Sequence, residues 1–181
     1  MFLEVLTRCY RRPGLLAANQ ASLRAQTCAD WTQTLLVDEE GRGIAWSYVN
    51  MAGYAPHLVG EYVWILDDDD LCVRPTLTAE LREIAERLDP DVIMLRMDHG
   101  PLGVLPDDAH WGQRPQCGRI GVSAFVVRRA YWQGCAEAMV SGAGYTADYA
   151  LIDAIWRTSA MIEWHDVVAS RVQRISGGAP E

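Results

Sequence analysis

The sequence contains no lysine, so all sixteen of its basic side chains are arginines. Any mechanism that needs a lysine is therefore excluded. This argues against a Walker-type phosphate loop, a Schiff-base enzyme and a phosphatase of the haloacid-dehalogenase type, each of which uses a lysine. Any cationic side chain in a functional site must be an arginine or a protonated histidine.

Positive charge is also scarce relative to negative charge. The formal net charge is -8 and the isoelectric point of the sequence is about 5.0. Proteins that bind nucleic acid neutralise its phosphates with a basic face. The composition therefore predicts that neither nucleic acid nor another polyanion is a partner.

Paired cysteines and long apolar runs are absent from the sequence. The five cysteines are odd in number, show no CxxC pair or zinc-ligand spacing, and are expected to be reduced thiols. The N-terminal charges follow the first apolar run, the reverse of a secretory signal, and no stretch approaches the length of a membrane span. These features predict a cytoplasmic protein without a transmembrane segment.

What the sequence does contain is a regular alternation of strand and helix patterns. Its 181 residues, half of them hydrophobic, suffice for one domain, 1–181, with one sizeable core. Apolar runs predict strands and helical spacing predicts helices, at 2–7, 14–27, 32–38, 44–51, 62–66, 75–88 and 91–97 in that order. This order predicts an α/β fold in which helices flank a Rossmann-like, mostly parallel central sheet.

The second half of the chain has weaker patterns. Residues 98–118 are rich in Gly and Pro and are expected to form a loop, either a lid or a flap on the acceptor side. A strand leading into a helix is expected from residue 120, a helix over 147–156, and one or two terminal strands over 161–174.

Polar residues follow the ends of the first three predicted strands, where ligands bind in parallel sheets. They are Thr7 and Arg8, then Asp38, then the four aspartates Asp67–Asp70. Four adjacent carboxylates repel one another unless a cation lies among them, and oxygen ligands suit Mg²⁺ or Mn²⁺. In an extended segment Asp67 and Asp69 would share one side and Asp68 and Asp70 the other. The alternative is a solvated turn that caps the next helix.

Three segments, TRCYRRP, NQASLRAQTCADWTQTLLVDEEGRG and VWILDDDDLCVRP, carry a family resemblance in their order along the chain. Over residues 2–98 the sequence resembles the N-terminal half of family 2 glycosyltransferases of GT-A fold. Those proteins open with a strand ending in Thr and a basic residue, then a helix begun by Pro. A second strand follows that ends in Asp, and a third carries Asp-x-Asp before a Pro.

The resemblance implies a donor site for a nucleotide-diphospho-sugar. Thr7 and Arg8 would line the nucleotide pocket and Asp38 would contact the base, although Asp38 is equally well explained as an ordinary turn residue. Asp67 and Asp69 would flank the sugar-phosphate and its metal ion. Within the tetrad we assign Asp67 and Asp68 to the donor, and Asp69 and Asp70 to Mn²⁺ or Mg²⁺. His165 would be a third metal ligand or else a partly buried strand histidine.

An inverting transfer needs a carboxylate that takes the proton of the acceptor hydroxyl. The family places it in a Glu-Asp pair at the start of a late helix, and in the matching segment GYTADYALIDAIW this position is Asp148. Ala147 stands where the family has its glutamate, and Asp148 could equally serve as a first-turn residue favoured by the helix dipole. Asp107, Asp108 and Asp153 are alternative bases.

The sequence thus predicts a metal-dependent glycosyltransferase that uses a UDP-sugar and a glycan or other hydroxyl acceptor. Residues 1–98 would form the donor half and 99–181 the acceptor half, and a homo-oligomer could complete the site. Arg171 and Arg174 could bind the diphosphate, and Trp111 could stack on an acceptor sugar. The alternatives are a non-catalytic nucleotide-sugar-binding module and, less favoured, a nucleotidyltransferase.

Overall fold

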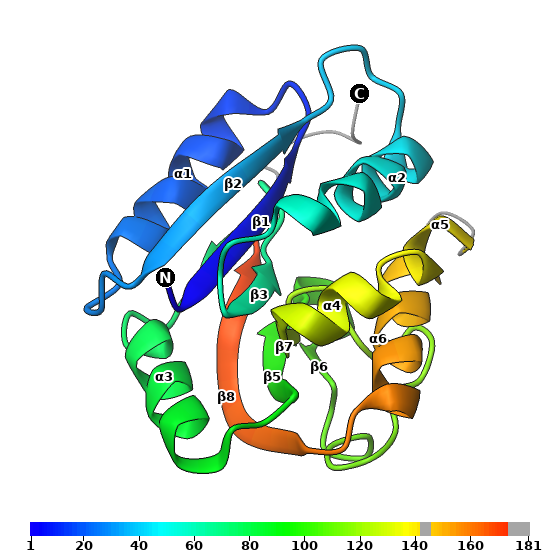
Figure 1. Ribbon diagram of the computed structural model, residues 1–181. Helices are drawn as coiled ribbons and strands as arrows, with labels where there is room; N and C mark the ends of the chain where they lie inside the picture. The colour runs from blue at the N-terminus through cyan, green and yellow to red at the C-terminus, as the bar shows by residue number, and fades with distance from the viewer. Residues whose placement is uncertain (142–145, 174–181) are drawn as a thin grey trace.

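A curled sheet between two layers of helices forms the body of the protein in a computed structural model, which describes residues 1–141 and 146–173 (Figure 1). The first half alternates strand and helix as predicted, with β1 (Leu3–Cys9), α1 (Pro13–Arg24), β2 (Trp31–Val37), α2 (Ile44–Tyr54), the 3₁₀ turn η1 (Ala55–His57) and β3 (Tyr62–Ile65). Pro13 begins α1, where its missing N–H has no intrahelical partner to lose.

The rest of the chain completes the sheet and adds helices. Its elements are β4 (Asp70–Cys72), α3 (Leu77–Leu88), β5 (Val92–Asp98), η2 (Gly100–Leu102), β6 (Val104–Leu105), β7 (Phe125–Arg128), α4 (Arg129–Cys135), α5 (Ala138–Ser141), α6 (Ala147–Thr158) and β8 (Ile162–Val172). Between β6 and β7 the chain forms the irregular segment predicted from its Gly and Pro content.

The sheet is mixed, whereas the sequence predicts a mostly parallel one. Among the described residues its strand order is β2-β1-β3-β7-β5-β8-β4, with β6 paired to β5. β1 is parallel to β2 and β3, and β5 is parallel to β8, but β7 lies antiparallel between β3 and β5. The short apolar run of β7 does not indicate which strands it pairs with. Its position between β3 and β5 is therefore known only from the three-dimensional structure.

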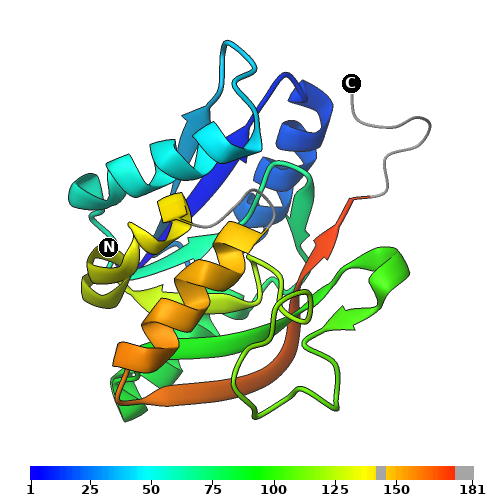
Figure 2. The ribbon, with the colours of Figure 1, turned by 90° about the vertical axis from the view of Figure 1, so that its right-hand side faces the viewer.

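Each face of the sheet has its own core. Leu23 of α1 and Leu77, Leu81 and Ile84 of α3 pack with Trp64 on one face. On the other face α2, α4, α5 and α6 supply buried side chains such as Met51, Trp132, Met139 and Leu151. Figures 1 and 2 show the same division, with α1 and α3 on one side of the sheet and the other four helices on the opposite side.

Burial on both faces makes this an α/β fold of the predicted class. The parallel pairing of β1 with β2 and β3 places the loops after these three strands at the same edge of the sheet. No helix in the described part of the chain is long and apolar enough to cross a membrane.

Candidate functional site at the carboxyl ends of three parallel strands

Three loops converge at one edge of the sheet, as predicted from the polar residues that follow the strands. The N–H of Asp68 donates to the carbonyl of Arg8 over 3.3 Å, which joins the loop after β3 to the end of β1. The N–H of Asp38 donates to the carbonyl of Cys9 over 2.8 Å, which joins the loop after β2 to the same segment. The structure thus brings Arg8, Asp38 and the aspartate tetrad to a single edge.

The tetrad Asp67–Asp70 is a tight turn, and the predicted extended alternation of its side chains is wrong. The N–H of Asp70 donates to the carbonyl of Asp67 over 2.9 Å, which closes the turn. The amide of the fully buried Asn19 donates to the carbonyls of both Asp67 and Asp70, each over 2.9 Å. Because Asn19 satisfies two buried carbonyls at once, α1 determines the shape of the turn. The sequence analysis did not identify Asn19.

Two arginines pair with the first three aspartates. Arg8 forms a bidentate pair with Asp67, with Nε 2.7 Å from Oδ1 and Nη2 bonded to Oδ2. Arg12 bridges two carboxylates, because its Nη2 and Nε contact Asp68 and its Nη1 lies 2.6 Å from Oδ2 of Asp69. Asp67, Asp68 and Asp69 therefore form ion pairs with Arg8, near the end of β1, and with Arg12, in the loop that follows β1.

Asp70 points into the protein instead of toward the loops. Its side chain is 4% exposed, and burial, followed by the charges of Asp67 and Asp69, raises its pKa well above the usual range. Burial likewise raises the pKa of Asp68 to about 6, although Arg12 opposes the shift. Burial of this kind favours the neutral form of a carboxyl group and so lessens the negative charge that Asp70 adds to the site.

Arg8 also links the tetrad to two residues from other elements. Its guanidinium carbon lies 4.4 Å from the ring centre of Tyr48, a buried residue of α2. Burial has the largest effect on the pKa of Asp148 and raises it. The N–H of Tyr149 and the charge of Arg8 act in the opposite direction. Arg8 thus couples electrostatically to the predicted base at the start of α6. Tyr48 was not among the predicted site residues, because a tyrosine on an apolar helix face gives no functional signal.

Asp38 organises its own loop. Its Oδ1 accepts the N–H groups of Glu40 and Gly41 over 3.2 and 2.8 Å, and its Oδ2 accepts that of Gly43 over 3.1 Å. Burial alone would raise the pKa of Asp38, but these backbone bonds outweigh it and the net shift is downward. Gly41 adopts a φ of +76° beside Tyr10, so a side chain is not tolerated there. The turn interpretation accounts for these contacts, and a contact between Asp38 and the base stays a prediction.

Thr7 is fully buried and its hydroxyl accepts a hydrogen bond from the amide of Gln33 over 2.8 Å. The same amide donates to Oδ1 of Asn19 over 2.8 Å. Thr7 therefore belongs to a polar network beneath the site, which supports Asn19 and through it the turn. Direct contact of Thr7 with a nucleotide stays a prediction.

His165 lies away from the tetrad. Its Nε2 is 2.7 Å from Oε2 of Glu80 on α3. His165 precedes Val172, the partner of Asp70 in the sheet, by seven residues of β8, which corresponds to roughly 20 Å along an extended strand. The structure does not bring His165 together with Asp69 and Asp70, and the strand interpretation describes it better.

The contacts of Glu80 with Arg74, Thr76 and His165 give a pH prediction. Burial raises the pKa of Glu80, but bonds from Arg74, Thr76 and His165 lower it to about 2. A carboxyl pKa that is lowered on folding contributes stability that is present above the unfolded value and lost as pH falls through the folded one. We expect Glu80→Gln to reduce the free energy of unfolding at pH 6 by about 1–3 kcal/mol and to flatten its decline between pH 4.5 and 2. Urea denaturation at several pH values across this range measures both quantities. If the free energy of unfolding declines with pH as steeply in the variant as in the parent, the contacts assigned to Glu80 are refuted.

The alternative bases are held in ion pairs elsewhere. Asp107 contacts His110 over 2.5 Å, and Asp108 lies 2.9 Å from Arg96. Asp153 lies 2.5 Å from both Arg114 and Arg157. Asp148 is affected by the site itself, because the charges of Arg8 and Asp67 both act on its carboxyl group.

Trp111 lies in the loop between β6 and β7 and packs against side chains of β5 and β8. The guanidinium carbon of Arg96 lies 4.3 Å from the ring centre of Trp111, and the ring meets Trp164 edge-on at 4.8 Å. Arg96 also contacts Asp166 over 2.5 Å and the carbonyl of Pro106 over 3.0 Å. Packing therefore accounts for Trp111.

Arg171 lies 2.8 Å from Asp98, and Arg174 lies outside the described residues.

The arrangement of the tetrad does not fit a divalent ion. The carboxylates of Asp67, Asp68 and Asp69 already pair with guanidinium groups, and Asp70 is buried. Across residues 1–141 and 146–173, no three His, Cys, Asp or Glu side chains are placed to hold a metal ion together. Binding of Mn²⁺ or Mg²⁺ stays a prediction from the sequence, and this geometry does not support it.

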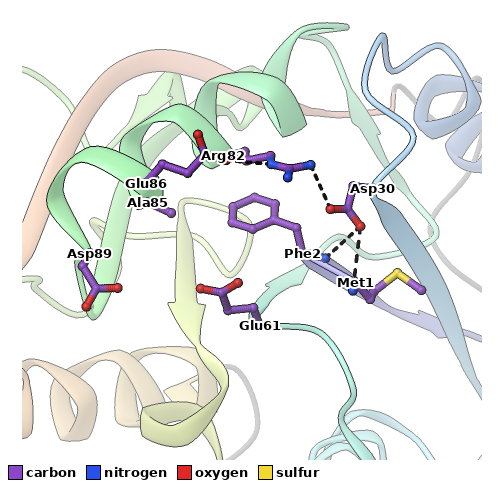
Figure 3. A pocket seen from close by; sticks show the side chains of 8 residues that line it. All are labelled: Met1, Phe2, Asp30, Glu61, Arg82, Ala85, Glu86 and Asp89. Atoms are coloured by element: carbon purple, nitrogen blue, oxygen red, sulfur yellow. Dashed lines mark hydrogen bonds and ion pairs between the residues drawn. The ribbon is translucent and has the colours of Figure 1, made fainter.

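A separate hollow of about 400 Å³ lies at the other end of β1, where Phe2 precedes the strand (Figure 3). Figure 3 shows Arg82 reaching Asp30, which also accepts the N–H of Phe2 over 3.1 Å. Arg82 additionally pairs with Glu86 over 3.0 Å. Arg82, which lines this hollow, is therefore already paired with two neighbouring carboxylates. The hollow lies roughly 20 Å along β1 from the converging loops.

No protein-family model and no curated protein matches the sequence. Among solved structures, crystal structures of S. aureus TarS residues 1–349 superpose on the chain at 12% sequence identity. The structure without a named ligand gives a TM-score of 0.71 over 96% of this chain and 60% of that one. The complex with UDP gives 0.72 over 96% and 61%, and the complex with UDP-GlcNAc gives 0.72 over 98% and 60%.

These matches concern the fold. They confirm the predicted GT-A-like α/β class and do not distinguish family 2 from other families of that fold. The chain spans about three fifths of the length of these TarS structures.

Proposed function

We propose that this chain is the nucleotide-sugar-binding domain of a glycosyltransferase and that it moves a sugar from a nucleotide-diphosphate donor to an acceptor hydroxyl. The observation that carries the proposal is the cluster at the carboxyl ends of β1 and β3, where Arg8 and Arg12 pair with the aspartates and where the charges of Arg8 and Asp67 act on Asp148. This is the edge at which parallel strands present ligand sites. Support also comes from the fold, because TarS has been crystallised in this fold with UDP and with UDP-GlcNAc.

Asp148 acts as the base in this proposal. Its carboxylate takes the proton of the acceptor hydroxyl while the hydroxyl oxygen attacks the anomeric carbon and the bond from that carbon to the diphosphate oxygen breaks. Attack from the opposite face inverts the anomeric centre. Partial burial raises the pKa of Asp148, which brings it closer to the operating pH and makes the carboxylate a stronger base.

The guanidinium groups of Arg8 and Arg12 stabilise the departing diphosphate. Arginine suits this role because it stays charged and presents several N–H donors in a fixed plane. Tyr48 restrains Arg8 by packing under its guanidinium at 4.4 Å. A preorganised cation costs no rearrangement at the moment when negative charge develops on the leaving group.

A non-catalytic nucleotide-sugar-binding module is the second candidate. It is favoured by Ala147, which stands where the family resemblance leads us to expect the glutamate of a Glu-Asp pair. Both candidates require the same donor site. They differ in turnover, so release of UDP from a UDP-sugar separates them.

Isothermal titration with UDP, GDP and dTDP tests the donor site. We expect UDP to bind in the micromolar range, about -8 kcal/mol, and the other two to bind more weakly. Arg82→Gln is the matched control, because Arg82 also pairs with two carboxylates but lines the hollow at the far end of β1. Its affinity for UDP should equal that of the parent. If none of the three nucleotides binds, with or without added Mn²⁺, the proposed function is wrong.

A further inference from the structure

The charge balance of the tetrad differs from that of an open metal site. Three carboxylates, Asp67, Asp68 and Asp69, face two guanidinium groups, and Asp70 is buried within the protein. A divalent ion would have to displace Arg12 from both Asp68 and Asp69 before it met free carboxylate oxygens. The protein therefore supplies its own cations at the position where the sequence predicts a metal ion.

Arg12 retains donors for a ligand. A guanidinium group carries five N–H bonds, and the contacts of Arg12 with Asp68 and Asp69 use three of them. Its side chain is 35% exposed, whereas that of Arg8 is 12% exposed. Two N–H bonds are thus left on the more accessible of the two arginines, where a phosphate oxygen could accept them.

The position of Arg12 adds further positive potential. Arg12 caps the N-terminus of α1, and its carbonyl accepts the N–H of Leu16 over 3.0 Å. The first turn of α1 contains no acidic side chain. The partial positive charge of a helix N-terminus therefore adds to that of the guanidinium on the side facing the loops.

Arg8 carries an unused donor as well. Its Nη1 is buried and has no hydrogen-bond partner among the described residues, although Nε and Nη2 are both bonded to Asp67. A buried N–H without an acceptor is costly, so a site that contains one gains when an oxygen-bearing ligand or a rearranged side chain accepts it. Arg12 thus offers N–H donors at the surface, and Arg8 adds a buried one.

We propose that Arg12, supported by Arg8, is the resident cation of this site and that a nucleoside diphosphate binds there without a divalent metal ion. This inference rests on the proposed function, because it concerns the same donor site. On binding, the diphosphate oxygens accept the free N–H bonds of Arg12, and the carboxylates of Asp68 and Asp69 hold its guanidinium in place. The aspartates orient an arginine in this arrangement, in place of coordinating a metal.

Three titrations test the inference on the intact chain. UDP is titrated into protein with excess EDTA and into protein with Mn²⁺, and Mn²⁺ alone is titrated into protein without nucleotide. We expect the two UDP affinities to agree within about threefold, a difference below 1 kcal/mol. We expect no heat of binding from Mn²⁺ alone. An affinity for UDP that rises tenfold or more with Mn²⁺ would overturn the inference and leave the donor site standing.

Arg12→Gln provides the second arm, with Arg11→Gln as its matched control. Arg11 is the adjacent arginine of the same loop, but among the described residues it contacts the carbonyl of Glu39 and the ring of Tyr10 instead of the tetrad. In EDTA we expect Arg12→Gln to weaken UDP binding by about 10–100-fold, because charge-assisted bonds are lost, and Arg11→Gln to leave it unchanged. Equal affinities of parent and Arg12→Gln would refute the role of Arg12.

The titration of Mn²⁺ into Arg12→Gln gives an independent readout. Removal of the guanidinium frees Asp68 and Asp69, so this variant should gain Mn²⁺ binding that the parent lacks. Absence of binding by UDP, GDP and dTDP to the parent under both conditions would contradict the proposed function itself. Dependence of binding on Mn²⁺ would contradict only the metal-independent site. The comparison of EDTA with Mn²⁺ on the parent decides the question even if the variant fails to fold.

Discussion

Replacement of Asp148 by asparagine should slow sugar transfer by roughly 10²–10⁴-fold, the contribution typical of a general base. Asparagine has nearly the same shape but accepts no proton at neutral pH, so the acceptor hydroxyl would have to attack without deprotonation. The affinity for UDP should stay within about threefold of the parent, because Arg8 and Arg12 keep their carboxylate partners. Release of UDP from UDP-GlcNAc in the presence of an acceptor measures transfer, and titration with UDP measures binding.

Asp108→Asn is the control for this experiment. Asp108 is one of the alternative bases, its side chain is 98% exposed, and it pairs with Arg96 far along the chain from Asp148. Its transfer rate should match that of the parent. If Asp108→Asn transfers sugar slowly and Asp148→Asn is fully active, the base lies in the loop between β6 and β7. If both variants keep the transfer rate of the parent, the base lies outside both elements.

The pH dependence of transfer provides a second check on Asp148. The base must be ionised to accept a proton, so the rate falls as pH decreases through its pKa. Because burial raises this pKa, the acidic limb should lie above the value of about 3.9 for an ordinary aspartate. Asp148→Asn should remove that limb from its residual activity. A limb that persists unchanged in the variant belongs to another group.

The sequence predicted the parts of the fold that depend on local patterns. The helix at Leu77–Leu88 and the strand at Tyr62–Ile65 were found because apolar spacing and Pro signals act over a few residues. The convergence of Arg8, Asp38 and the tetrad followed from the rule for parallel strands, which requires only the order of the elements.

Long-range contacts were beyond the sequence. Nothing in Phe125–Arg128 indicates that this strand lies antiparallel between β3 and β5. Asn19 looks like an ordinary helix residue, yet its amide bridges two carbonyls of the tetrad turn. The tetrad itself was interpreted as extended, because the alternation rule holds within strands and gives no warning of a turn.

The same limit explains the metal prediction. Four aspartates indicate a cation, but composition cannot tell a bound ion from an arginine supplied by the chain. Arg8 and Arg12 are 59 and 57 residues away from the aspartates Asp67 and Asp69 in sequence, and only the fold brings them together. His165 was assigned to the site by analogy and lies with Glu80 instead.

Arg8→Met should reduce the free energy of unfolding by about 3 kcal/mol and abolish detectable UDP binding. The side chains of Arg8 and Asp67 are only 12% and 14% exposed, so removal of the guanidinium leaves a largely buried carboxylate without its counterion. The packing of the guanidinium on Tyr48 is lost at the same time. Urea denaturation at pH 7 measures the change in stability, and Arg11→Met, at an exposed position in the same loop, controls for loss of a positive charge.

The double variant Arg8→Met with Asp67→Asn separates charge from packing. If the single variant is destabilised by an unpaired buried carboxylate, neutralising Asp67 should recover about 1–3 kcal/mol, because a buried ion pair contributes little net stability over a neutral pair. UDP binding should not return, since the donors of Arg8 are still missing. A double variant no more stable than Arg8→Met would assign the loss to the Tyr48 contact. Recovered stability together with recovered binding would show that Arg8 neutralises the tetrad without taking part in recognition, and Arg12 alone would then act as the cation of the site.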